Sequence, residues 1–160
     1  MVLVSDEEYR KFVSRKKHVT IENVEVEVGR AWRIDEFSPP KEYKTEEFTV
    51  WSFPSRGDWA THTGNYRGNW SPYIPRNLIS KYTQPGDTVV DQMCGSGTTL
   101  VECKLLGRNG IGVDINPDAV MVARDRLNFD YNPLDQTVHS EIRTYEGDAR
   151  NLNLIENNRF

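Results

Sequence analysis

The residues best suited to chemistry lie in one short run, which reads Asp-Gln-Met-Cys-Gly-Ser-Gly-Thr-Thr over positions 91–99. It follows the short apolar stretch Thr88–Val90 and leads into the helix-forming stretch Leu100–Leu106, which ends at Gly107. This order predicts a buried strand, a glycine loop and a helix. Small residues between a strand and a helix let backbone N–H groups approach a polar or anionic ligand, so the run predicts a ligand-binding loop.

Two further acidic residues follow the loop, each at the end of an apolar stretch. Asp114 ends the stretch Asn109–Asp114, and Asp148 follows the stretch Ile142–Tyr145. The carboxyl ends of strands form the usual ligand edge of an open α/β sheet, and a carboxylate there can accept hydrogen bonds from both ribose hydroxyls of a nucleoside. Taken alone, Asp114 also suits a surface loop and Asp148 a helix N-cap, but their order behind the loop favours a ligand site.

The run over 91–99 resembles the cofactor loop of the amino-methyltransferases, which methylate exocyclic amines of cytosine or adenine with S-adenosylmethionine. The family pattern is roughly Asp-Pro-Phe-x-Gly-Ser-Gly-Thr-Thr, from which this chain departs at Gln92 and Met93. The resemblance covers about residues 51–150 and is strongest over 85–118. A dinucleotide-binding Rossmann loop needs a third glycine where this chain has Leu100, so a nicotinamide or flavin domain is disfavoured.

The resemblance implies an S-adenosylmethionine site built on three successive strand ends. Gly95, Gly97 and Thr98 would hold the methionine part, Asp114 the ribose and Asp148 the adenine amino group. The expected cofactor site is completed by the neighbours of these residues, namely Asp91, Met93, Cys94, Ser96, Thr99, Ile115 and Ala149.

The stretch over residues 51–80 combines three of the four tryptophans with arginine, asparagine and glycine. Such a mixture can stack on bases and grip phosphates, or it can pack a loop against the cofactor. Residues 71–79 resemble the segment before the cofactor loop in amino-methyltransferases, whose helix flanks the methionine end, although Ser71 stands where histidine is usual. We expect the cofactor or target pocket to be lined by Trp59, Tyr66, Arg67 and Tyr73.

Residues 1–50 are expected to form an N-terminal extension that precedes a cofactor-binding half over residues 51–160. Residues 6–17 suit a short capped helix, and residues 19–28 alternate apolar and polar side chains as an edge strand or hairpin arm does. Residues 34–48 are polar and contain two prolines, which is typical of a loop.

The elements together predict the α/β class, with a Rossmann-like methyltransferase fold that is incomplete because only its first three strands are visible. A second helix is expected after Asn116, which suits an N-cap, with Pro117 at its first position. Val120, Ala123 and Leu127 recur at helical spacing and would form the apolar face of that helix.

The catalytic residues are unknown from this sequence. The resemblance implies an Asp/Ser/Asn-Pro-Pro-aromatic motif after a fourth strand, which would begin near residue 151. The nearest copy, Ser38-Pro39-Pro40, is followed by Lys41 where the aromatic residue belongs. We therefore expect the motif in a missing C-terminal half or in a partner chain. The sheet would then have an unpaired apolar edge, which that segment, the partner or self-association would cover.

Composition places further bounds on the function. The 160 residues carry 20 Lys and Arg against 24 Asp and Glu, so any nucleic-acid surface must be local. Cys94 and Cys103 have neither zinc spacing nor the pattern of a disulfide framework, and no metal site is expected. No apolar stretch is long enough to span a membrane and no signal peptide is recognisable, so a cytoplasmic location is expected.

These observations favour S-adenosylmethionine-dependent methylation of a base amino group, at cytosine N4 or adenine N6, with DNA favoured over RNA as the partner. Two alternatives stay open from the sequence. One is an RNA guanine-N2 methyltransferase, and the other is a non-catalytic cofactor-binding subunit of a split methyltransferase.

Overall fold

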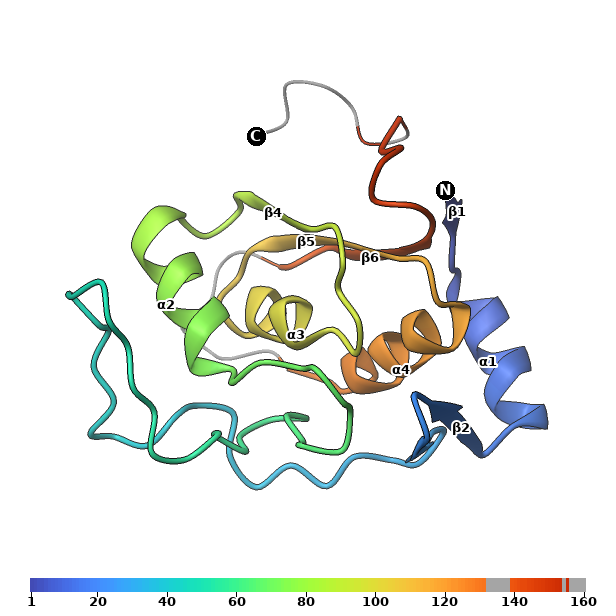
Figure 1. Cartoon of the computed structure of the whole chain (residues 1–160), viewed down its shortest axis with the longest axis horizontal. Coiled ribbons are helices and arrows are strands. Elements are labelled where there is room, and N and C mark those ends of the chain that lie inside the picture. The colour runs from blue at the N-terminus through green and yellow to red at the C-terminus, as the bar shows by residue number, and fades with distance from the viewer. Residues whose placement is uncertain (132–138, 154, 156–160) are drawn as a thin grey trace.

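The elements of the chain are seen in a computed structural model, which describes residues 1–131, 139–153 and 155. A fourth strand expected from residue 151 onward falls in part on residues outside this description. In chain order the elements are β1 (Val2–Leu3), α1 (Asp6–Arg15), β2 (His18–Ile21), β3 (Val24–Glu27), α2 (Tyr73–Tyr82), β4 (Thr88–Asp91), α3 (Thr98–Leu105), β5 (Asn109–Asp114), α4 (Pro117–Leu127) and β6 (Ile142–Glu146) (Figure 1).

The main sheet has the strand order β1-β6-β5-β4. β4, β5 and β6 are parallel, which confirms the α/β class, whereas β1 pairs antiparallel with β6. The three parallel strands coincide with the three that the sequence predicted. β1 was not predicted, since two residues are too few to show an alternating pattern. In the part of the chain that the structure describes, β4 lies at one edge of the sheet.

Helices α3 and α4 pack on the same face of the main sheet (Figure 1). α3 can approach β5 closely because residue 112 is a glycine. A Cβ at this position would lie 2.5 Å from Cδ1 of Leu100. Ile111, Val113 and Tyr145 form a cluster of buried side chains on the sheet. The described side chains of Met1, Leu152 and Ile155 pack against this cluster. The chain beyond β6 runs over the face of the sheet opposite α3 (Figure 1).

The N-terminal elements follow from local sequence signals. α1 begins with a capping box, in which Ser5 Oγ accepts a hydrogen bond from the backbone N–H of Glu8 and the Glu8 side chain accepts one from Ser5 N. β2 and β3 form a hairpin whose two turn residues, Glu22 and Asn23, have φ angles of 49° and 67°. Positive φ at both positions is typical of a type I′ turn, which matches the twist of the two strands.

The first 50 residues pack against α4. Four buried valine and isoleucine side chains of the hairpin region share a core cluster with Ala119 and Val122 of α4. Asp125 of α4 accepts hydrogen bonds from Tyr9 Oη at 2.7 Å and from the backbone N–H of Gly29 at 2.6 Å. The division of the chain at residue 50 stays a prediction.

Candidate cofactor-binding site

The glycine loop runs from Asp91, the last residue of β4, to Thr98, the first residue of α3. Gly95 and Gly97 have φ angles of 49° and 80°, which favour glycine over other residues. A Cβ at Gly97 would lie 2.9 Å from Cβ of Ala123, so this glycine also lets α4 approach the loop. The loop therefore needs glycine at both positions for its shape and its packing.

Asp114 braces the glycine loop from the end of β5. Its Oδ2 accepts a hydrogen bond from the backbone N–H of Gly95 at 2.8 Å, and its Oδ1 accepts one from the backbone N–H of Asn116 at 2.9 Å. A carboxylate offers about four lone-pair sites, so these two bonds leave acceptor capacity for ligand hydroxyl groups. The chain order of β4 and β5 places this carboxylate beside the loop, as the sequence predicted.

A cavity of about 340 Å³ lies between the glycine loop and the segment over residues 66–70. Its volume falls within the range of small-molecule sites. The Tyr66 ring packs on the loop, since a Cβ at Gly95 would lie 3.2 Å from its Cε1. Burial, together with the negative charge of Asp114, raises the pKa of Tyr66, so its phenol stays protonated. The cavity is lined by Tyr66, Arg67, Gly68, Asn69, Trp70, Asp91, Met93, Cys94, Gly95, Ser96, Thr98 and Asp114.

Most of the residues that the sequence assigned to the cofactor meet at this cavity. Gly97 and Thr99 do not line it, although Thr98 between them does. Ile115 does not line it either and is 69% exposed. The residues that do line it are Asp91, Met93, Cys94, Gly95, Ser96, Thr98 and Asp114, together with Tyr66 and Arg67 from the expected pocket.

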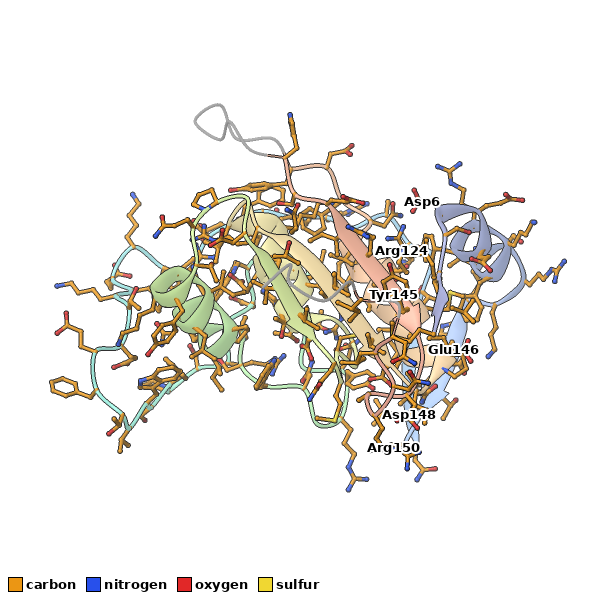
Figure 2. All side chains as sticks on the ribbon, turned by 90° about the horizontal axis from the view of Figure 1, so that it is seen from above. Asp6, Arg124, Tyr145, Glu146, Asp148 and Arg150 are labelled. Atoms are coloured by element: carbon orange, nitrogen blue, oxygen red, sulfur yellow. The ribbon has the colours of Figure 1, made fainter. Side chains whose placement is uncertain are left out.

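Asp148 and Ala149 follow β6 and do not line this cavity. The Asp148 carboxylate forms an ion pair with Arg150, and both side chains lie beyond Glu146 at the end of β6 (Figure 2). The hydrogen bonds from Arg150 lower the pKa of Asp148 to about 2. In this arrangement Asp148 is engaged with its neighbour, and its role toward the adenine stays a prediction.

Trp59 and Tyr73, which we expected at the pocket, lie in the protein core instead. Trp59 is 3% exposed, and its indole N–H donates a hydrogen bond to Oε1 of Glu102 at 2.8 Å. Tyr73 is also buried and stacks on Phe53, with 5.0 Å between ring centroids. Their aromatic character therefore serves packing, which the composition of the segment did not distinguish from pocket lining.

Sequence reasoning missed the buried carboxylate of Glu102 in α3. Besides the indole of Trp59, it accepts hydrogen bonds from His62 Nε2 at 2.8 Å and from a guanidinium nitrogen of Arg76 at 2.7 Å. Burial lowers the pKa of His62, so the imidazole is neutral and donates through Nε2. A glutamate in a short helix reads as a solvent-facing residue, so nothing in the sequence indicated this network.

Sequence reasoning also missed Arg126 of α4, whose side chain is buried beside the loop. Its guanidinium donates hydrogen bonds to Ser96 Oγ at 2.7 Å, Thr63 Oγ1 at 2.8 Å and Asn65 Oδ1 at 2.9 Å. Burial lowers the pKa of Arg126 to about 10, which still leaves it charged at neutral pH. Thr61 Oγ1 donates to the backbone carbonyl of Arg126 at 2.7 Å, which adds a further link to the same segment.

The Cys94 thiol is part of the loop and does not have the properties of a nucleophile. Burial raises its pKa well above the ordinary value, and the nearby carboxylate of Asp91 acts in the same direction. The thiol is therefore protonated, which suits a small packing residue. The described residues include no group of three or more His, Cys, Asp and Glu side chains that could hold a metal ion. None of their helices is long and apolar enough to cross a membrane.

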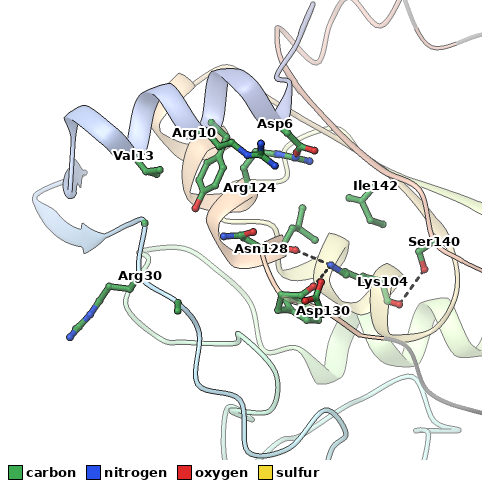
Figure 3. Close-up of a pocket in the computed structure, with 15 residues that line it drawn as sticks. Asp6, Arg10, Val13, Arg30, Lys104, Arg124, Asn128, Asp130, Ser140 and Ile142 are labelled. Atoms are coloured by element: carbon green, nitrogen blue, oxygen red, sulfur yellow. Dashed lines mark hydrogen bonds and ion pairs between the residues drawn. The ribbon is translucent and has the colours of Figure 1, made fainter.

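A second cavity, of about 530 Å³, lies between α1, the end of α4 and the start of β6 (Figure 3). Lys104 projects to its wall and donates hydrogen bonds to the backbone carbonyls of Leu127 at 2.9 Å and Phe129 at 2.6 Å. Asp6 and Arg124 form an ion pair on another side. No residue of the glycine loop lines this cavity, so it is separate from the candidate site.

Comparison with known proteins identifies the family of the chain. A family model described as a DNA methylase matches residues 2–125, so the chain belongs to the DNA methylase family. It is 31% identical over 88 residues to the Type II methyltransferase M.MjaII of Methanocaldococcus jannaschii. The aligned residues are 54% of this chain and 17% of that protein. It is 41% identical over 58 residues to M.HpaI of Haemophilus parainfluenzae, covering 36% of this chain and 18% of the relative.

The matched region is short compared with the relatives themselves. With M.SmaI of Serratia marcescens the chain shares 31% identity over 94 residues, which is 56% of this chain but 30% of that protein. The chain thus spans less than a third of the length of these relatives. The family match begins at residue 2 and includes the residues that we had expected to form an extension.

Proposed function

We propose that this chain supplies the cofactor-binding part of an S-adenosylmethionine-dependent DNA methyltransferase that acts on cytosine N4 or adenine N6. The observation that carries the proposal is the cavity between the glycine loop and residues 66–70, with the Asp114 carboxylate in its wall. Membership of the DNA methylase family and similarity to proteins named Type II methyltransferases support the same activity.

The residues of the cavity fit the chemistry of this cofactor. Thr98 Oγ1 is buried beside the cavity and has no hydrogen-bond partner among the described residues, so it is free to bind a polar ligand group. Thr98 also begins α3, whose N-terminal N–H groups favour an anionic group such as the carboxylate of an amino acid. Asp114 has the acceptors that two ribose hydroxyls require.

Each part of the cavity then has a distinct task. The backbone of Gly95 and the hydroxyl of Thr98 would hold the methionine part, Gly97 would keep the loop in shape, and Asp114 would hold the ribose. The bound cofactor supplies the methyl group in an activated form. The contribution of this chain is to fix its position, because proximity and orientation lower the barrier to an in-line displacement. The Tyr66 ring packs on the loop at Gly95 and forms part of the cavity wall.

DNA would approach the same cavity from its open side. Arg67 and Trp70 line the cavity and are exposed, so they can contact phosphate and stack on a base. Among the described residues the Arg67 side chain has one ion pair, a long one of 3.7 Å with the exposed Glu22, which lets it turn toward a phosphate.

Catalysis needs a group that accepts the hydrogen bonds of the exocyclic amine, and we infer that it comes from outside this chain. Among the described residues, β4 has no neighbouring strand on its outer side. A strand from a C-terminal segment or from a partner chain could pair there and bring the Pro-Pro-aromatic motif to the cavity. The small share of each relative's length that this chain covers supports this proposal.

Titration calorimetry with S-adenosylhomocysteine tests the cofactor site. We expect Asp114→Ala to weaken binding about 30-fold, since hydrogen bonds to a charged group contribute about 2 kcal/mol. Asp114→Asn should weaken it less, because one oxygen acceptor stays in place. Asp118→Ala is the matched control, since this aspartate pairs with Lys16 and does not line the cavity. Absence of binding by the folded wild-type chain would contradict the proposed site.

A further inference from the structure

Arg126 is a buried cation whose direct partners are all neutral. Its side chain is 1% exposed, and the guanidinium donates to two hydroxyl oxygens and one amide oxygen. In the described part of the chain no carboxylate lies within ion-pair distance of it. A buried charge without an opposite charge beside it costs considerable stability, so its position calls for an explanation.

The partners of Arg126 belong to the two walls of the candidate cavity. Ser96 is part of the glycine loop and lines the cavity directly. Thr63 and Asn65 begin the segment that continues into residues 66–70 on the opposite wall. Asn69 of that wall donates to the Thr63 carbonyl at 3.0 Å, so the link reaches the lining residues themselves. One side chain from α4 therefore joins both walls.

The surroundings of Arg126 concentrate positive charge behind the loop. Arg56 lies close enough for its charge to lower the pKa of Arg126. Two nitrogen atoms of Arg56 are buried and have no hydrogen-bond partner among the described residues. In a buried environment the field of such charges is weakly screened, so it extends to a ligand group at Ser96. Thr98, which lines the same cavity as Ser96, has a buried Oγ1 without a hydrogen-bond partner among the described residues.

We propose that Arg126 is a positioning residue, which holds Ser96 and the 63–70 segment around the amino-acid end of the cofactor and favours the carboxylate found there. This inference rests on the proposed function, because it takes the cavity to be the S-adenosylmethionine site. It assigns the selectivity for the amino-acid part of the ligand to a side chain that does not itself line the cavity.

Two ligands separate this role from a purely structural one. S-adenosylhomocysteine carries the amino-acid carboxylate, whereas 5′-methylthioadenosine shares the nucleoside and thioether but has no amino-acid part. General loosening of the site would weaken both ligands by the same factor. Loss of a charge that favours the carboxylate would weaken S-adenosylhomocysteine far more than 5′-methylthioadenosine.

The experiment compares the affinities of both ligands for the 160-residue chain by calorimetry. We expect Arg126→Gln to weaken S-adenosylhomocysteine about tenfold or more and 5′-methylthioadenosine by less than about threefold, given the usual contribution of charged interactions. Arg126→Lys should keep most of the wild-type preference, because the positive charge is retained. Arg124→Gln is the control, since Arg124 lies on the same helix but pairs with Asp6 at the separate cavity.

Equal weakening of both ligands, or unchanged binding of both, by Arg126→Gln would overturn the inference. If circular dichroism shows that this variant does not fold, Thr63→Val decides instead, because it is nearly isosteric and removes one partner of the guanidinium. It should weaken S-adenosylhomocysteine about threefold and 5′-methylthioadenosine less, as expected for one lost hydrogen bond. A folded wild-type chain that binds neither ligand would instead contradict the proposed function.

Discussion

At the scale of single residues, Glu102 shows how the segment before α2 is attached to the sheet. Its carboxylate is fully buried and accepts hydrogen bonds from Trp59, His62 and Arg76. Two donors from the irregular segment before α2 and one from α2 itself thus converge on a single side chain of α3. Since residues 66–70 belong to the same segment as Trp59 and His62, Glu102 helps to fix one wall of the candidate cavity from a distance.

Replacement of Glu102 is expected to destabilise the fold. Glu102→Ala leaves the partly buried guanidinium of Arg76 and two buried donors without their acceptor, and breaking a buried charge pair costs about 3 kcal/mol. Urea denaturation followed by tryptophan fluorescence measures this loss. The exposed Glu141, which pairs with Arg143, is the matched control, and Glu141→Ala should cost less than about 0.5 kcal/mol. Similar midpoints for the two variants would show that the network contributes little.

His62 makes the stability of the chain dependent on pH. Burial lowers its pKa in the folded state below the ordinary value of 6.5. Below about pH 6.5 the unfolded chain therefore binds more protons at this residue than the folded chain, so stability falls as the pH is lowered through this range. His62→Gln keeps a nitrogen donor for Glu102 but does not titrate. We expect the wild type to lose more stability than this variant between pH 7.5 and pH 5.5 in urea titrations, and parallel losses would contradict the assignment.

The sequence revealed the site residues whose signal is local and missed those whose role depends on tertiary packing. The glycine loop and Asp114 were predictable, since each is adjacent in sequence to the strand that positions it. Glu102 and Arg126 were not, because a charged residue in a helix normally faces solvent and only the packed segment buries it. For the same reason Trp59 was read as a pocket residue, although its indole belongs to the core.

At the scale of elements, the hairpin shows how a turn alters a sequence pattern. Val19 and Ile21 occupy odd positions, whereas Val24, Val26 and Val28 occupy even ones, so the alternation changes phase between the two groups. The structure explains the change, since Glu22 and Asn23 form a two-residue turn. The sequence therefore predicted extended chain here correctly, but it did not separate a single edge strand from a complete hairpin.

The contact between the glycine loop and α4 depends on Gly97. A side chain at this position meets Cβ of Ala123 at 2.9 Å, and a φ of 80° is unfavourable for other residues. We expect Gly97→Ala to lower the free energy of unfolding by about 2 kcal/mol, of which about 1 kcal/mol reflects the left-handed backbone. Adding Ala123→Gly should restore the steric part alone. A double-mutant cycle measured in urea tests this, and strictly additive losses would show that the two side chains do not meet.

At the scale of the whole molecule, the chain joins its first residues to its last described strand. Val2 and Leu3 pair with Glu146 and Tyr145. Met1 packs closely on Gly147, since a Cβ added to this glycine would lie 2.6 Å from Cγ of Met1. This pairing covers part of the outer side of β6, whereas β4 has no neighbour on its outer side among the described residues. The two edges of the sheet thus differ, and the uncovered one lies next to the glycine loop.

Removal of residues 2–4, with Met retained before Ser5, tests how much this pairing contributes. The truncation removes the two-residue strand, the buried side chain of Val4 and the hydrogen bond from its N–H to the Thr144 carbonyl at 2.9 Å. Burial of a valine side chain alone contributes about 1.5 kcal/mol or more, so we expect a total loss of about 2 to 3 kcal/mol in urea denaturation.

The same truncation should also promote association, because it leaves the β6 edge free to pair with another chain. Sedimentation velocity at several concentrations would then show a larger dimer fraction for the truncated chain than for the full chain. Val2→Thr with Leu3→Thr is the control, since both side chains are largely exposed and the backbone pairing is kept. A truncated chain with unchanged stability and sedimentation would mean that β1 frays in solution and that the sheet closes on this side without it.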